Sequence, residues 1–267
     1  MTLFHLVLVA LIQGLTEFLP VSSSGHLILL PSLTGMDDQG QAIDVAVHVG
    51  TLFAVIMFFW ADVKIAIRGI GRLVQGKVDT QGARLALYLG IATVPVLIFG
   101  LFLKLTGLDH LLRSVALIGW TMLIFGLVLY WTDQKGGTTK TAPDWSRKDA
   151  IIMGLWQAVA LIPGTSRSGA TISGARQLGY AREDAAKLSM LMSIPTIIAS
   201  GAVLGSEVIF SANMQLAKDS LIAAVLSFGA ALLALSLMMR LLKSVSFTPY
   251  VIYRIFLGVA LLAFAYS

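Results

Sequence analysis

Residues 18–26, Phe18-Leu-Pro-Val-Ser-Ser-Ser-Gly-His26, and residues 162–169, Ile162-Pro-Gly-Thr-Ser-Arg-Ser-Gly169, each interrupt an otherwise apolar stretch of the chain. The two stretches cover about residues 3–34 and 150–177. A broken backbone at membrane depth is tolerated only where protein or a water-filled cavity surrounds it. We therefore interpret both stretches as re-entrant helix–loop–helix pairs that enter and leave the membrane on one side. Two helices joined by an aqueous loop are the alternative.

The composition of the chain is typical of a helical membrane protein. Of its 267 residues, 57% are apolar and only 12% are charged, and the mean hydropathy is +0.85. Soluble globular domains carry about 25% charged residues, so a disordered chain, a coiled coil and an ordinary soluble enzyme are excluded. Cysteine is absent, which excludes disulfides and thiolate metal sites. The net charge of +5 indicates basic cytoplasmic loops, and no nucleic-acid partner is expected.

Six further segments are long and apolar enough to cross about 30 Å of hydrocarbon as helices. They cover roughly residues 42–60, 84–105, 114–131, 184–205, 220–240 and 249–266. Together with the interrupted stretches they predict an all-α polytopic membrane protein, with six transmembrane helices plus two re-entrant helix–loop–helix pairs. No polar stretch is long enough for another domain, so residues 1–267 are expected to form a single integral membrane domain.

The two interrupted stretches resemble each other as a weak internal repeat. Ser22 aligns with Ser166, and Ser24 aligns with Ser168. Three predicted spans separate the stretches, and this odd number makes the second pair enter from the opposite side. The loops of both pairs should then meet near the midplane, in the inverted-repeat layout that places binding sites between broken helices. The predicted repeats cover about residues 1–131 and 150–267.

Basic residues are unequally distributed between the two sides of the predicted membrane. Loops and span ends on the side of the N-terminus hold three Lys or Arg residues, among them Arg113, and the other side holds fourteen. Arg167 and Arg254 lie within apolar segments and are left out of this count. The positive-inside rule places the fourteen, including those of a loop over 61–84, in the cytoplasm. Both termini and the opening of the first re-entrant pair are therefore expected outside.

The residues of the two loops are suited to binding an anion. Each loop leads into a short helix, whose N-terminus presents unpaired N–H groups and about half a positive charge. Arg167 adds a planar guanidinium that can contact phosphate through two N–H groups. An arginine at membrane depth needs a partner, which a bound anion or Glu17 could supply. The alternative is that Arg167 only pairs with Glu17 and holds the repeats together.

Glu17 and the histidines carry the remaining chemical signal. A lone carboxylate in an apolar stretch is a functional-site candidate; Glu17 could accept a proton, orient a nucleophile or bind a divalent cation, or only anchor an ion pair. Gln13 lies one helical turn before Glu17 on the same helix face. Its amide could contact a bound ligand or could only pack between helices. His26 follows the serines and could be acid, base or nucleophile. His48 lies one turn after Asp44, and a local helix contact accounts for it.

Three motifs together resemble one known family. Gln13-Gly-Leu-Thr-Glu17 matches an (E/Q)xxxE motif, Pro20-Val-Ser-Ser-Ser-Gly-His26 matches PVSSxGH, and Pro163-Gly-Thr-Ser-Arg-Ser-Gly169 matches PGxSRSG. In this order, and over nearly the whole chain, the sequence resembles the undecaprenyl-diphosphate phosphatase family, also called the bacitracin-resistance family. The resemblance implies a bacterial inner-membrane enzyme that hydrolyses undecaprenyl diphosphate to undecaprenyl phosphate and so recycles the lipid carrier of cell-wall precursors. It also implies a site open to the periplasm and a divalent cation, Mg²⁺ or Ca²⁺.

The family motifs assign candidate roles to residues of this chain. The catalytic candidates are Glu17, Ser23, His26 and Arg167, and Glu17 is also the candidate metal ligand. The candidates for substrate binding around them are Gln13, Ser22, Ser24, Thr165, Ser166 and Ser168. Because Gln13 occupies the first position of the acidic motif, this helix offers one carboxylate rather than two. A serine, a histidine or water could be the nucleophile. The sequence also leaves open whether the protein forms a homodimer.

A transporter or flippase for a phosphate-bearing lipid or solute is the rival function. Inverted repeats with broken helices suit alternating access, and an anion site suits such a cargo. A carrier needs binding groups only, whereas Ser23 and His26 add a nucleophile and a base. The sequence therefore favours an enzyme over a transporter.

Overall fold

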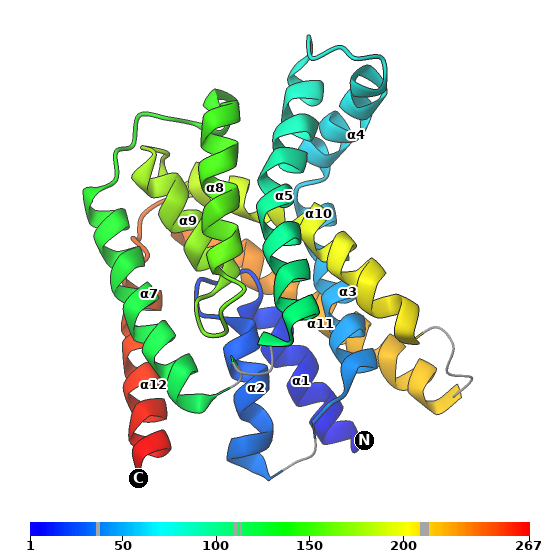
Figure 1. Cartoon of the computed structure of the whole chain (residues 1–267), viewed down its shortest axis with the longest axis vertical. Helices are drawn as coiled ribbons and strands as arrows, with labels where there is room; N and C mark the ends of the chain where they lie inside the picture. The colour runs from blue at the N-terminus through cyan, green and yellow to red at the C-terminus, as the bar shows by residue number, and fades with distance from the viewer. Residues whose placement is uncertain (36–37, 109–111, 113, 209–213) are drawn as a thin grey trace.

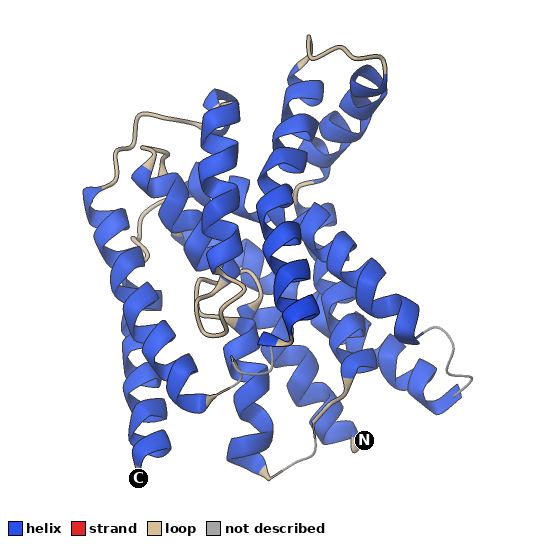
Figure 2. Ribbon diagram, viewed as in Figure 1, coloured by secondary structure: helices blue, strands red, loops and turns tan. Residues whose placement is uncertain are grey.

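The protein is a bundle of helices in which six are long and apolar enough to cross a membrane (Figures 1 and 2). The structure is a computed structural model that describes residues 1–35, 38–108, 112, 114–208 and 214–267. Within these residues no strand occurs beyond an isolated bridge between Lys140 and Tyr180. The six long helices are α3 (Gln41–Phe58), α5 (Gln81–Thr106), α7 (Val115–Lys135), α10 (Arg182–Val208), α11 (Met214–Leu241) and α12 (Thr248–Tyr266). The all-helical class and the six predicted spans are confirmed.

Two pairs of short helices occupy the positions of the interrupted stretches. They are α1 (Leu3–Thr16) with α2 (Ser23–Thr34), and α8 (Arg147–Val159) with α9 (Arg167–Gln177). The residues between them form a first loop, 17–22, and a second loop, 160–166. Proline, glycine and serine end each helix early, because they favour turns and caps over helix interiors. In Figure 1 the two loops lie close together in the middle of the bundle.

The prediction of a loop over residues 61–84 is wrong for most of that range. The structure has a helix there, α4 (Trp60–Val74), which begins directly after α3 ends. Its apolar and basic side chains alternate at helical spacing, and a basic amphipathic segment of this kind forms a helix along a surface. Gly69 lets α4 approach α5 closely, since a Cβ there would lie 2.0 Å from the carbonyl carbon of Gly82.

The charge asymmetry corresponds to the two ends of the bundle. Both chain termini lie at one end, and α4 lies at the other (Figure 1). Lys187 on α10 pairs with Asp62 on α4 at 2.7 Å, which joins two of the basic segments at the α4 end. Arg113, one of the three basic residues expected on the side of the termini, lies outside the described residues.

Arg176 differs from the other basic residues at the α4 end because its side chain is buried. It pairs with Asp133 of α7 at 3.1 Å and donates to the carbonyl groups of Gly136 and Gly137. Asp133 also accepts from Arg182 at 2.8 Å. Nearby, burial raises the pKa of the Tyr180 hydroxyl, which stays protonated. This network fixes the end of α9 against α7, so that the opposite end of α9 is held at the second loop.

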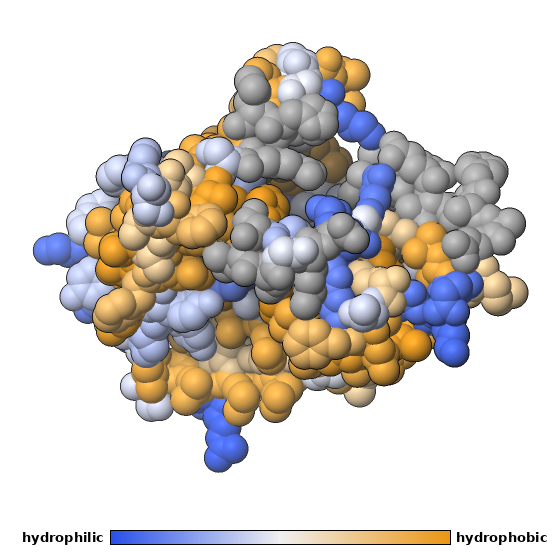
Figure 3. All heavy atoms as spheres, turned by 90° about the horizontal axis from the view of Figure 1, so that it is seen from below, coloured by the Kyte–Doolittle hydropathy of each residue, from blue (hydrophilic) through white to orange (hydrophobic). Residues whose placement is uncertain are grey.

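Small residues bring the long helices into close contact. Gly50 of α3 faces α11, and a Cβ there would lie 2.2 Å from the carbonyl oxygen of Ala224. Gly119 of α7 and Gly258 of α12 likewise face each other's helix. Such contacts are common in membranes, where van der Waals packing holds helices together. Large apolar side chains such as Phe53 and Met57 stay exposed, and hydrophobic residues cover much of the surface in Figure 3, as lipid contact requires.

Candidate active site

Two serines with left-handed backbone conformations begin the helices that follow the loops. Ser22 has φ 73° and Ser166 has φ 72°. The Ser22 hydroxyl accepts from the Gly25 N–H at 3.3 Å, and the Ser166 hydroxyl accepts from the Gly169 N–H at 3.1 Å. Such conformations cost free energy in residues other than glycine, and they concentrate at functional sites. The two loops thus present two helix N-termini with the same geometry.

The loops contact each other directly. The Ser168 hydroxyl, at the start of α9, donates to the carbonyl oxygen of Leu19 in the first loop at 2.9 Å. Gly164 of the second loop has φ +86°, and a Cβ there would lie 2.1 Å from the Thr121 hydroxyl oxygen of α7. A Cβ on Gly25 would lie 3.6 Å from the Cα of Gly164. Glycine is thus required at position 164, and its place beside Gly25 brings the two loops together.

Arg254 of α12 joins both loops to the bundle. Its side chain is fully buried at 0% exposure. One Nη donates to the carbonyl oxygen of Pro20 at 3.2 Å, and the other donates to that of Gly164 at 3.0 Å. The Nε donates to Met122 on α7 at 3.2 Å. The sequence analysis missed this role, although an arginine inside an apolar span is itself a signal.

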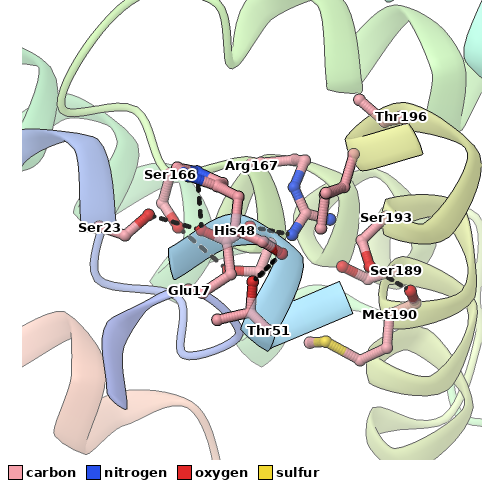
Figure 4. A network of polar contacts seen from close by, with 12 residues as sticks. Glu17, Ser23, His48, Thr51, Ser166, Arg167, Ser189, Met190, Ser193 and Thr196 are labelled. Atoms are coloured by element: carbon pink, nitrogen blue, oxygen red, sulfur yellow. Dashed lines mark hydrogen bonds and ion pairs between the residues drawn. The ribbon is translucent and has the colours of Figure 1, made fainter. Parts of the chain in front are cut away.

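Glu17 is the centre of the polar contacts between the loops. Its Oε1 accepts from Nη2 of Arg167 at 2.7 Å, and its Oε2 accepts from the Ser23 hydroxyl and from Nε2 of Gln13, each at 2.8 Å. Nε2 of His48 lies 3.9 Å from Oε2. Figure 4 shows the Ser23, His48 and Arg167 side chains directed at Glu17. The structure therefore brings Gln13, Glu17, Ser23 and Arg167 together, from α1, the first loop, α2 and α9.

Several polar atoms around this centre are buried without a partner in the described part of the chain. They include Nη1 of Arg167, Oγ1 of Thr165 and Oε1 of Gln13. A buried donor without a hydrogen bond costs about 1–3 kcal/mol. A phosphate oxygen is an acceptor that either of these two donors, the guanidinium or the threonine hydroxyl, could use. The guanidinium can meet such an anion through Nη1 while Nη2 remains on Glu17.

The sequence analysis missed His48 as a member of the site. Its Nδ1 lies 2.7 Å from the carbonyl oxygen of Asp44, the local contact that was expected. That contact makes Nδ1 the donor, because a carbonyl oxygen only accepts, and Nε2 is the ring nitrogen nearest Glu17. The explanation by a local contact alone is therefore incomplete. Sequence spacing gives no signal for this residue, because only the packing of α3 beside α1 brings it to the carboxylate.

His26 lies apart from the Glu17 centre. Its Nδ1 contacts the carbonyl oxygen of Ser22 at 2.6 Å, and its Nε2 contacts the hydroxyl of Tyr253 at 2.6 Å. Between described residues, neither a hydrogen bond nor an ion pair joins His26 to Glu17, Ser23 or Arg167. Both ring nitrogens are thus engaged elsewhere, with Tyr253 stacked at a centroid distance of 5.7 Å.

The remaining serines of the motifs have mostly structural contacts. Ser22 and Ser166 cap helices, and the Ser168 hydroxyl is used in the contact with Leu19. Ser24 is exposed, and its hydroxyl oxygen lies 3.4 Å from that of Ser22. Of the three serines in the first motif, Ser23 is therefore the one whose hydroxyl contacts a carboxylate.

The oxygen atoms of Glu17 and Gln13 suit a divalent cation that is also bound by a phosphate. Among the described residues, no group of three or more His, Cys, Asp or Glu side chains could hold a metal alone. Mg²⁺ is commonly bound by one or two carboxylates together with substrate phosphates and water. Glu17 supplies one carboxylate, and Gln13, whose Nε2 donates to it, has an amide oxygen without a partner among the described residues.

Comparison with known proteins gives one consistent result. The model of the family described as "Bacitracin resistance protein BacA" matches residues 6–260. A protein of Dinoroseobacter shibae named undecaprenyl-diphosphatase is 72% identical over the whole of both chains. One of Roseobacter denitrificans with the same name is 71% identical, again over the full length of both. A more distant relative, undecaprenyl-diphosphatase 1 of Rhodospirillum rubrum, is 44% identical over 100% of this chain and 96% of its own.

Proposed function

The chain belongs to the bacitracin resistance protein BacA family, and we infer from this premise that it is an undecaprenyl-diphosphatase. It is a multi-pass membrane enzyme that hydrolyses undecaprenyl diphosphate to undecaprenyl phosphate and phosphate. The family supports this function over a transporter or flippase. The structural observation that best fits the activity is the Glu17–Arg167 contact between the two loops, beside the serine hydroxyl of Ser23.

Arg167 and the helix N-termini are our candidates for binding the diphosphate. The free N–H groups of Nη1 and the Thr165 hydroxyl lie on the second loop and at the start of α9. The N-termini of α2 and α9 add positive potential where they meet. Charge neutralisation and positioning supply most of the catalysis in phosphoryl transfer. These groups would hold the terminal phosphate next to Ser23.

The Ser23–Glu17 hydrogen bond supports a route through a phosphoserine. Ser23 Oγ attacks the terminal phosphorus while its proton passes to Glu17, and the bond from that phosphorus to the bridging oxygen breaks. The bridging oxygen keeps the electron pair, takes the proton from Glu17 and leaves with undecaprenyl phosphate. Water then attacks the phosphoserine, and its proton returns through Glu17 to Ser23 Oγ. Phosphate is released, and the enzyme regains its starting state.

A divalent cation would bind at the Glu17 carboxylate and the Gln13 amide oxygen. When bound, it would offset negative charge on the diphosphate and act as a Lewis acid. Arg167, which donates to Glu17, would share this neutralisation.

The membrane arrangement of the enzyme follows from its charges and its short helices. We place α1–α2 and α8–α9 as re-entrant pairs of an inverted repeat, because each of these helices has 14 residues or fewer. The excess of basic residues at the α4 end supports a cytoplasmic location for that end. The termini, and the opening that leads to Glu17, would then face the periplasm of a bacterial inner membrane.

Purified protein in detergent is expected to release phosphate from undecaprenyl diphosphate without any gradient. Chelation with EDTA should lower the rate by at least about tenfold, since a bound cation contributes several kcal/mol to charge stabilisation. Mg²⁺ or Ca²⁺ added in excess should restore it. Transport of the lipid without phosphate release would contradict the proposed function, and full activity in EDTA would contradict the cation.

Ser23→Ala removes the proposed nucleophile and is expected to lower phosphate release by about 10⁶-fold, the size of loss known for removal of a serine nucleophile from a hydrolase. Ser24→Ala is the matched control, because this neighbouring serine is exposed and contacts Ser22 rather than Glu17. It should retain activity close to that of the unmodified enzyme. Rapid acid quench with labelled substrate should trap phosphate on Ser23. Normal turnover without an adduct would favour direct attack by water.

A further inference from the structure

A groove between α3 and α10 lies beside the candidate active site, because His48 is part of its lining. Its volume is about 520 Å³. It is lined mainly by apolar groups of two helices that are both long enough to span a membrane, so its outer side faces lipid. The lining includes Val45, His48, Val49 and Leu52 of α3, with Ile197, Ile198, Gly201 and Ala202 of α10.

His48 connects this groove to the Glu17 centre. The same side chain lines the groove and places Nε2 3.9 Å from Glu17 Oε2. Figure 4 shows His48 on α3 beside Glu17, with α10 on the other side of the site. A polar site and an apolar groove therefore meet at one imidazole, which has both a polar edge and an apolar ring.

A second apolar groove, between α3 and α11, lacks this connection. It is larger, about 710 Å³, and its lining includes Phe53, Trp60 and Val225 but none of the residues that contact Glu17. Behind it the two helices are closely joined, because the Ser227 hydroxyl donates to the Val47 carbonyl oxygen at 2.5 Å. The lining of the α3–α11 groove therefore has no residue beside Glu17, whereas that of the α3–α10 groove has His48.

We propose that the α3–α10 groove binds the part of the polyprenyl chain next to the diphosphate, with His48 at the boundary between the chain and the charged headgroup. The proposal rests on the function proposed above. When the headgroup of a lipid is buried in a polar site, its chain must extend from that site to the bilayer. This groove offers the chain an apolar path that starts at His48, beside Glu17. Its volume is typical of pockets for small ligands, so it holds the first isoprene units and leaves the rest of the chain in lipid.

Gly201 allows the groove to be filled without disturbing the helix. Among the described residues, a Cβ at this position meets no atom within 4 Å, so a side chain can be added at Gly201 without a clash at its first atom. Gly229→Phe is the matched control, because Gly229 also lies on a long apolar helix with open space at its Cβ and belongs to neither groove. Val225→Phe fills the rival groove in the same way.

In lipid vesicles, Gly201→Phe is expected to raise the KM for undecaprenyl diphosphate about tenfold, which corresponds to about 1.4 kcal/mol. The KM for methyl diphosphate, which has no prenyl chain to enter the groove, should stay unchanged. Gly229→Phe and Val225→Phe should alter neither value. The proposal would be overturned if Gly201→Phe and its control had equal KM values, or if Gly201→Phe raised the KM equally for both substrates. It would also be overturned if only Val225→Phe changed the KM.

Photolabelling of the unmodified enzyme tests the same groove without relying on turnover or on a variant. A prenyl diphosphate with a photoreactive group on its second isoprene unit should label residues 44–52 of α3 and 197–202 of α10. Labelling of α11 instead would overturn the proposal. The unmodified enzyme could also be labelled in the groove and yet release no phosphate from either substrate. That result would contradict the proposed phosphatase function and would support the groove as a binding site for the prenyl chain.

Discussion

Arg167→Ala is expected to lower phosphate release from undecaprenyl diphosphate by about 10³-fold or more, the range for loss of an arginine that stabilises transferring phosphate. The variant removes the donor to Glu17 and also the unpartnered Nη1 that we assign to the diphosphate. Most of the loss should therefore appear in kcat/KM. The measurement is phosphate release in detergent, with gel filtration and circular dichroism to show that the variant folds.

A charge exchange separates catalysis from a purely structural ion pair. Removing one partner of a buried pair destabilises a protein by about 3–5 kcal/mol, so a single variant alone cannot distinguish the two roles. Glu17→Arg combined with Arg167→Glu restores opposite charges across the loops. If the pair only holds the loops together, the double variant should recover both thermal stability and activity. We expect it to recover stability and remain inactive.

Arg254→Ala is expected to produce the largest loss of stability among single changes outside the Glu17 centre. The substitution leaves the carbonyl groups of Pro20, Gly164 and Met122 without their donor. Each buried group without a partner costs about 1–3 kcal/mol, so the free energy of unfolding should fall by about 3 kcal/mol or more. Activity should fall as well, because a shift of about 1 Å in catalytic groups can cost roughly 10²-fold in rate.

Arg240→Ala is the control for this change, since Arg240 is an exposed arginine at the end of α11. Its effect on stability should stay within about 0.5 kcal/mol, as is usual for surface substitutions. The stability of Arg254→Lys should lie between those of Arg254→Ala and Arg240→Ala, because an ammonium keeps the charge but cannot reach both loops at once. Thermal unfolding in detergent measures all three. Equal melting temperatures for Arg254→Ala and Arg240→Ala would show that the loops hold together without the guanidinium.

The sequence was sufficient for the long helices and for the place of the two loops. Hydrophobic length identifies membrane spans directly, and the prolines and glycines of residues 18–26 and 162–169 identify the breaks. The contact between Glu17 and Arg167 was also predictable, because two lone opposite charges in apolar stretches need partners. Helix α4 was missed because its basic residues were counted as loop charges before their helical spacing was considered.

Contacts that depend on the neighbours of a helix could not be predicted. His48 reaches Glu17 only because α3 lies beside α1, and no spacing within α3 indicates that neighbour. The separation of His26 from Glu17 also has a tertiary cause, since Tyr253 arrives from α12 and takes up its Nε2. The family motif distinguishes Ser23 from Ser24, but residue type alone does not. The turn of α2 alone decides which of them meets the carboxylate.

The position of Arg254 has a consequence for how the enzyme is made. The residue that ties both loops together lies on the last helix, so ribosomal synthesis delivers it after every other part of the catalytic machinery has entered the bilayer. A nascent chain that stops before α12 carries all of the reactive side chains but not the cross-link that aligns them. Competence for hydrolysis is thereby coupled to the synthesis of α12.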